Sequence, residues 1–140
     1  MTKTFNRAPM ALLALLLATG AHAAPHFADV VVSDSADGDA VATFALGTPK
    51  IYVHAGLADV AHGSKVSSDW IAEDTGGAAP PNYKIDSVTL DTGLLTNVVT
   101  FSLSKPNNGW PAGKYRVDLF IDGTPAGAAH FKVNKDADND

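Results

Sequence analysis

The chain has 140 residues, no cysteine, and 15 acidic against 10 basic side chains, which gives a net charge of −5 with histidine neutral. The lack of thiols excludes a cysteine nucleophile, a cysteine-ligated zinc and an iron–sulfur cluster, and it leaves an apolar core to hold the fold without disulfides. The acidic balance disfavours phosphate backbones and anionic lipid headgroups, so we expect no nucleic-acid partner.

The first 23 residues have the pattern of a secretory signal peptide. Lys3 and Arg7 give a positive start, an apolar run covers 10–18, and Ala21-His22-Ala23 supplies a small-residue cleavage site. A membrane span needs roughly 20 apolar residues, and this run is shorter. We predict cleavage after Ala23, no membrane anchor in the product, and a mature domain of net charge −7 in the periplasm or outside the cell, because Lys3 and Arg7 leave with the signal.

After the signal, short apolar runs alternate with glycine, proline, asparagine and aspartate, which predicts strands joined by turns. The clearest alternation in the first half places Ile51, Val53 and Ala55 on one face. Residues 34–40 and 74–82 are predicted loops, the second long and flexible. The strands expected in this half are His26–Ser33, Ala42–Leu46, Lys50–Leu57 and Lys65–Glu73.

The second half ends in a predicted β-hairpin. Tyr115, Val117, Leu119 and Ile121 alternate with polar residues, and Asp122-Gly123 is a turn dipeptide. A loop is expected at 105–111. The strands expected in this half are Tyr83–Asp91, Asn97–Ser104, Lys114–Ile121 and Ala126–Val133.

Short strands at fairly regular spacing predict an all-β fold, an antiparallel sandwich of about seven strands that follows the signal helix. A closed barrel is the less favoured alternative for so short a chain. We assign residues 24–41 to an N-terminal strand and acidic loop, 42–134 to the sandwich, and 135–140 to a disordered acidic tail.

The last hairpin carries a family resemblance. Gly113-Lys114-Tyr115-Arg116-Val117, then Asp122-Gly123, then Phe131-Lys132-Val133 resembles the closing hairpin of bacterial exported immunoglobulin-like domains. The resemblance covers roughly residues 42–134 and lacks the two cysteines of antibody domains. It implies that Trp70 is the core tryptophan and that Tyr115 acts as a tyrosine corner. It implies no activity, because such folds host many functions.

Four histidines remain after cleavage: His26, His54, His62 and His130. A copper or zinc carrier would need two or three of them to converge. His26 would stand third in the mature chain, where histidine can chelate copper, but Pro25 has no N–H to give up. We therefore predict no cofactor, and we keep the metal carrier as an alternative to ordinary strand and surface histidines.

Acidic residues and serines give little sign of catalysis. Asp69 and Asp118 would form a carboxylate pair only if the fold brought them together. No G-x-S-x-G elbow is present. The aspartates at 34, 37 and 39 and at 136, 138 and 140 lack the remaining ligands of a calcium loop, so we interpret them as solubilising. We predict a protein that is not an enzyme.

Aromatic side chains are the candidate binding residues. Tyr52 and Phe120 fall on the outward phase of their strands, and Asn108 and Trp110 belong to the 105–111 loop. Trp110 has two interpretations: an exposed ring that stacks on a sugar or anchors a partner, or a plug over the end of the core. Phe120 indicates either that both faces of its strand are covered or that an apolar patch is exposed.

We therefore predict an exported, non-enzymatic binding or accessory domain that recognises a protein or envelope component. Loops on a rigid scaffold usually carry recognition, so the 74–82 and 105–111 loops, which we expect at one end, are the predicted contact region. Two alternatives remain: the histidine-based copper or zinc carrier, and a structural subunit that assembles through open sheet edges.

Overall fold

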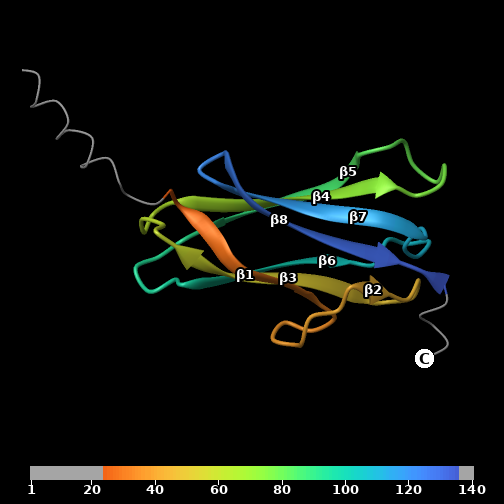
Figure 1. The fold of residues 1–140 in the computed structure, drawn as a ribbon, viewed down its shortest axis with the longest axis horizontal. Helices are drawn as coiled ribbons and strands as arrows, with labels where there is room; N and C mark the ends of the chain where they lie inside the picture. The colour runs from red at the N-terminus through yellow and green to blue at the C-terminus, as the bar shows by residue number, and fades with distance from the viewer. Residues whose placement is uncertain (1–23, 136–140) are drawn as a thin grey trace, which may run out of the picture.

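The computed structural model describes residues 24–135. The signal peptide predicted at 1–23, and residues 136–140 of the predicted tail, lie outside the described residues. Eight strands occupy this part of the chain (Figure 1): β1 His26–Ser33, β2 Thr43–Phe44, β3 Lys50–Ala58, β4 Lys65–Asp74, β5 Tyr83–Asp91, β6 Val98–Ser104, β7 Gly113–Ile121 and β8 Thr124–Val133.

The strands form two sheets packed face to face, in the orders β1-β3-β6 and β2-β8-β7-β4-β5. The predicted all-β sandwich is confirmed, with one correction. β2 pairs with β8 in parallel, while the remaining pairs are antiparallel. The parallel pair is short, with two paired positions, Thr43 with Lys132 and Phe44 with Val133. The amides of Lys132 and Asn134 donate to the carbonyls of Ala42 and Phe44 at its two ends.

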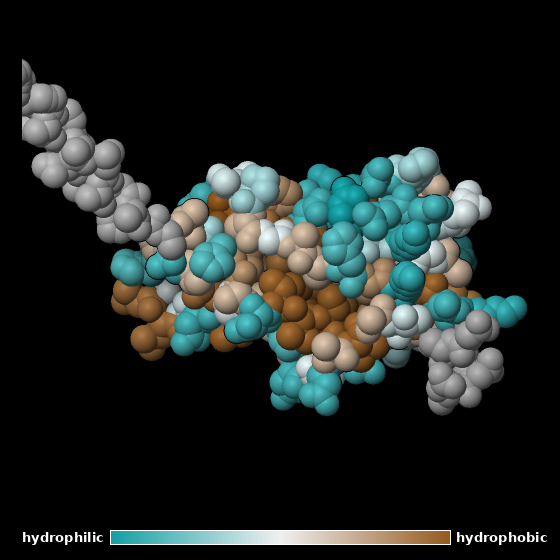
Figure 2. All heavy atoms as spheres, in the orientation of Figure 1, coloured by the Kyte–Doolittle hydropathy of each residue, from teal (hydrophilic) through white to brown (hydrophobic). Residues whose placement is uncertain are grey.

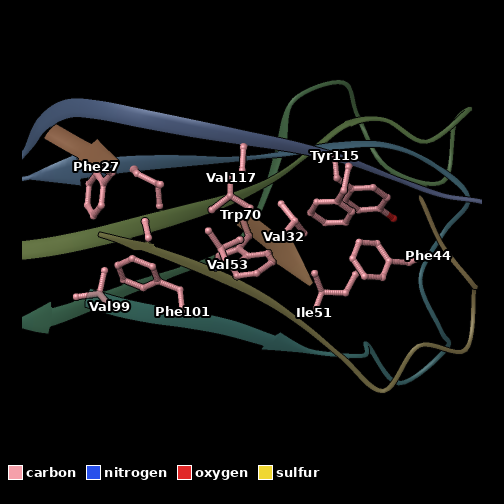
Figure 3. Packing of buried hydrophobic residues seen from close by; sticks show 14 of the residues in the cluster. Phe27, Val32, Phe44, Ile51, Val53, Trp70, Val99, Phe101, Tyr115 and Val117 are labelled. Atoms are coloured by element: carbon pink, nitrogen blue, oxygen red, sulfur yellow. The ribbon is translucent and has the colours of Figure 1, made fainter. Parts of the chain in front are cut away.

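The core lies between the sheets and follows the predicted alternation. Trp70, Phe101, Tyr115 and Phe131 are all buried. Figure 3 shows Phe27 and Val99 filling one end of this core and Tyr115 and Phe44 the other. The burial of these side chains in place of disulfides is the main stabilising term of the fold.

β4 departs from simple alternation. A bulge in its pairing with β5 falls between Trp70 and Ile71, so both of these neighbours are buried. Ile71 lies outside the core cluster, opposite Arg116 of β7. A strict period of two therefore describes the first part of β4 and not its end.

One face of the molecule has a hydrophobic middle (Figure 2), over the seam where β1 and β8 meet. The seam is lined by Val30, Val31, Val41 and Ala129, and the valines among these are half-buried. Within residues 24–135, no helix is long and apolar enough to span a membrane.

Candidate binding cleft between two loops

Two loops meet at the end of the sandwich where β5 and β7 begin. The first loop joins β4 to β5 and is held by Thr75, whose hydroxyl accepts from the Ala79 amide at 3.1 Å. The second joins β6 to β7 and is tied to the chain before β3, because the Trp110 amide donates to Leu46 at 3.2 Å. Gly113 lets the two loops approach, since a Cβ there would lie 2.2 Å from the Asp74 carbonyl oxygen.

Between the loops lies a cleft of about 480 Å³, here called the loop cleft. Most of its lining atoms are apolar, and hydrogen-bonding side chains stand at its rim. The β4–β5 side contributes Ala72, Thr75, Ala78, Ala79, Tyr83 and Ile85, and the β6–β7 side contributes Pro106, Asn107, Asn108, Gly109, Trp110, Pro111 and Tyr115. A concave, largely apolar site with a few polar groups is the usual form of a binding pocket.

Trp110 forms part of the floor of this cleft and is buried, with 2% of its surface exposed. Its indole N–H donates to the Thr48 carbonyl at 2.8 Å, and its ring meets Tyr115 and Phe131 edge to face. The plug interpretation is therefore right, and an exposed Trp110 that stacks on a ligand is wrong. Trp110 can be buried at this end of the core because the Thr48 carbonyl accepts the hydrogen bond of its indole N–H.

Tyr115 is the second buried aromatic residue that lines the floor of the cleft. Its hydroxyl donates to the carbonyl of Pro111, four residues upstream, which is the bond expected of a tyrosine corner. Its ring stacks on Phe131 with centroids 5.1 Å apart. Burial raises the pKa of Tyr115 to about 12, because the ionised phenolate would lose its hydration.

The other predicted binding residues do not converge on one site. Asn108 is exposed and lines the loop cleft. Tyr52 lies on the outer face of the β1-β3-β6 sheet, where the Lys50 ammonium stands 5.9 Å from its ring centroid. Phe120 lies on the other sheet, half-buried opposite Ser67 and Pro125. Its ring is therefore partly covered.

The histidines of the alternative metal site are also dispersed. His26 and His54 belong to β1 and β3, His62 lies in the β3–β4 turn, and His130 lies on β8 of the other sheet. His130 faces Glu73 at 3.9 Å, and the His26 ring bonds to the Ala24 carbonyl. Within the described part of the chain, no three histidine, aspartate or glutamate residues are grouped to hold a metal ion.

The fold does bring the two candidate carboxylates together. Asp69 and Asp118 are direct cross-strand partners on β4 and β7, which the sequence pattern did not indicate. Each carboxylate has its own partners. Asp69 accepts a hydrogen bond from the Ser87 hydroxyl at 2.6 Å and forms an ion pair with Lys84. Both carboxylate oxygens of Asp118 accept from Nε of Arg116. Neither residue lines the loop cleft.

Arg116 organises the charges on the outer face of this sheet. Besides Asp118, its guanidinium contacts Glu73 at 3.2 Å and the Asn82 side-chain oxygen at 2.8 Å. The hydrogen bond to Asp118, with a smaller contribution from Glu73, raises the pKa of Arg116 above its usual value. The Asn82 bond fixes the end of the β4–β5 loop, and so this network supports one side of the loop cleft.

Sequence reasoning missed two sets of residues. Tyr83 and the alanines of the β4–β5 loop line the cleft, and nothing marked small side chains as part of a site. The second set lies at the opposite end of the sandwich, where Leu94 and Leu95 are 77% and 93% exposed. Two leucines after the turn residues Asp91-Thr92-Gly93 were a signal, because a surface turn seldom contains adjacent large aliphatic residues.

Comparison with known proteins supports the fold. No family model matches the chain, and neither does any curated protein. An immunoglobulin-like protein from Pseudomonas aeruginosa superposes with a TM-score of 0.50 at 12% identity, over 81% of this chain and 94% of that one. The chain therefore has an immunoglobulin-like β-sandwich fold, as its last hairpin implied, with Trp70 and Tyr115 buried as in that fold.

A second solved structure is a Pseudomonas fluorescens alkylpurine DNA glycosylase bound to DNA with an abasic site analogue. It matches with a TM-score of 0.48 and 17% identity over 79% of this chain. The present chain spans 30% of the length of that enzyme.

Proposed function

We propose that this chain is an exported, non-enzymatic binding domain that recognises a protein or another component of the cell envelope through its loop cleft. The single observation that carries the proposal is the convergence of two loops on one apolar cleft above a buried aromatic floor. Loops that present a ligand site from a rigid sandwich are the usual way in which this fold binds.

The cleft is suited to an apolar side chain flanked by hydrogen-bonding groups. Its floor is rigid, because Trp110 and Tyr115 are each fixed by a bond to a backbone carbonyl. Its rim offers the exposed amides of Asn107 and Asn108 and the half-exposed ring of Tyr83. A preformed pocket costs little conformational entropy on binding, which favours recognition by a small contact.

Export is the other part of the proposal, and it rests on the charge, apolar run and small-residue site of residues 1–23. Intact-mass measurement of the protein recovered from a cell-envelope fraction should give a chain that begins at Ala24. Recovery of the uncleaved chain from the cytoplasm would overturn this part.

Binding is tested with the processed protein immobilised and incubated with an envelope extract. We expect Tyr83→Ala and Asn108→Ala each to lower the amount of the main captured component about tenfold. Each substitution removes a side chain at the rim of the cleft, and a few such side chains supply most of the binding free energy of a small interface. Tyr52→Ala is the matched control, because it removes the same ring from the outer face of the opposite sheet.

Thermal unfolding of all three variants checks that the fold is unchanged. We expect wild-type midpoints, because the substituted side chains lie outside the core cluster. Equal capture by the wild type and both cleft variants would overturn the proposed site. A loss of capture in Tyr52→Ala alone would move the site to the β1-β3-β6 face.

A further inference from the structure

The exposed leucines belong to a turn that the fold holds firmly. The Thr96 amide donates to the Gly93 carbonyl at 3.2 Å, and the Gly93 amide donates to the Thr96 hydroxyl at 2.9 Å. Leu94 and Leu95 are the two central residues of this turn, here called the leucine tip. In Figure 2 hydrophobic surface gathers at the left end of the molecule, where Figure 1 places the loop between β5 and β6.

Thr92 anchors the leucine tip to the sandwich. Its hydroxyl donates to the Ser64 carbonyl at 2.9 Å, its amide donates to the same carbonyl, and its own carbonyl accepts from Gly63. On the other side, the Leu57 amide donates to the Asn97 carbonyl at 2.9 Å. The two leucines are thus presented in a fixed conformation, so a partner that covers them does not have to order the turn first.

The charged residues at the two ends of the sandwich differ. Beside the leucine tip, Asp59 and Asp122 follow β3 and β7 and Asp91 ends β5, and Lys65 stands among them, paired with Asp91 at 2.6 Å. At the loop-cleft end, cations stand where β3, β5 and β7 begin and where β6 and β8 end: Lys50, Lys84, Lys105, Lys114 and Lys132. Lys84, Lys105 and Lys114 each directly adjoin a residue that lines the cleft, and Lys84 is paired with Asp69. The acidic residues that adjoin lining residues are Glu73, Asp74 and Asp86, so the surround of the cleft contains both signs.

We propose that the leucine tip of one molecule docks into the loop cleft of a second copy of this chain, head to tail. The tip supplies two fixed aliphatic side chains with an acidic surround, and the cleft supplies an apolar hollow with Lys105 and Lys114 among the charged residues beside it. This contact rests on the loop cleft of the proposed function and names one occupant for it. Because the two surfaces lie at opposite ends of each molecule, the contact is heterologous and repeats along a row of copies.

The expected association is weak. Two leucines in a cleft cover much less than the roughly 800 Å² per partner that stable complexes bury. We therefore expect a dissociation constant of about 0.1 to 1 mM, at which copies associate when they are crowded or tethered and separate on dilution. Salt should weaken the contact without abolishing it, because it screens the charges and leaves the apolar burial intact.

The test is sedimentation velocity of the processed protein over a concentration series up to about 1 mM. The wild type should form species larger than dimers as the concentration rises. Leu94→Ser with Leu95→Ser should remain monomeric, and so should Ala78→Glu, which places a carboxylate in the cleft. Ala36→Glu, with the same added charge in the exposed loop before β2, should associate like the wild type.

Mixing the two defective variants makes the test specific. The double serine variant keeps an intact cleft and Ala78→Glu keeps an intact tip, so an equimolar mixture should form a dimer and nothing larger. A monomeric wild type throughout the series, or a double serine variant that associates like the wild type, would overturn the proposal. Tip-dependent binding of the monomer to phosphatidylcholine vesicles would also overturn it, in favour of a lipid surface.

The proposed function can fail separately. If the double serine variant captures the envelope component as well as the wild type does, while Tyr83→Ala does not, the cleft binds that component whether or not copies associate. If association depends on the cleft and capture does not, self-docking stands and the envelope partner is wrong.

Discussion

The two ends of this sandwich use their large apolar side chains in opposite ways. At the loop-cleft end, Trp110 and Tyr115 turn inward, meet Phe131, and satisfy their polar atoms on backbone carbonyls. At the other end, the core closes with Phe27 and Val99, and the leucine tip points outward. The same residue class therefore stabilises the fold at one end and is available to a partner at the other.

The comparison indicates how to separate stability from recognition in this chain. A substitution at the aromatic end should act first on unfolding, because the ring is surrounded by other core residues. A substitution at the leucine tip should leave unfolding unchanged and act on association. The predictions below test that division from its largest expected effect to its smallest.

Trp110→Ala should lower the free energy of unfolding by about 3–5 kcal/mol, the range for removing a buried aromatic ring. The loss combines the edge contacts with Tyr115 and Phe131 and the bond to the Thr48 carbonyl. Urea unfolding followed by tryptophan fluorescence of Trp70 measures it. A variant as stable as the wild type that binds partners poorly would contradict the division and restore an exposed, ligand-stacking role for Trp110.

Gly113→Ala should cost about 3 kcal/mol or more, because its Cβ would stand 2.2 Å from the Asp74 carbonyl oxygen at a backbone φ of 154°. Gly123→Ala is the matched change at the other end. Its φ is 81° and nothing lies within 4 Å of the new Cβ, so only the backbone conformation is unfavourable, at about 1 kcal/mol. Equal midpoints of thermal unfolding would show that the loops separate easily at Gly113.

Alkaline pH should destabilise the aromatic end through Tyr115. Its pKa is about 12 in the folded chain and about 10 when unfolded, so the stabilising contribution is complete below pH 10. Above pH 10 the unfolded chain releases the proton first, and stability falls by up to roughly 3 kcal/mol as the pH rises to 12. Urea unfolding at several pH values measures the decline, and Tyr115→Phe should show a shallower one.

The strands and their buried faces could be predicted from the sequence because alternation reports burial directly. Val117 and Leu119 on β7 and Ile51 and Val53 on β3 all lie in the core as expected. Ile71 could not be predicted, since a bulge shifts the phase within β4 and depends on the neighbouring strand. The parallel pairing of β2 could not be predicted either, because a strand of two residues has no sequence pattern that shows which way it runs beside its neighbour.

The candidate site was half predictable. The two loops were expected at one end, and they do line one cleft. The burial of Trp110 required knowledge that the Thr48 carbonyl, 62 positions away, would accept its N–H. The pairing of Asp69 with Asp118 likewise depends on strand register, which neither segment specifies alone. The sequence therefore could not predict which distant residues would become the partners of these polar groups.

Replacing Leu94 and Leu95 by serine should change the free energy of unfolding by less than about 0.5 kcal/mol, the smallest effect of the series. Both side chains are mostly exposed, so little apolar burial is lost, and the turn bonds come from Gly93 and Thr96. Urea unfolding at a concentration far below that of self-association measures it. A loss comparable to that of Trp110→Ala would mean that the leucines pack onto the sandwich in solution, and the outward tip that separates the two ends would not exist.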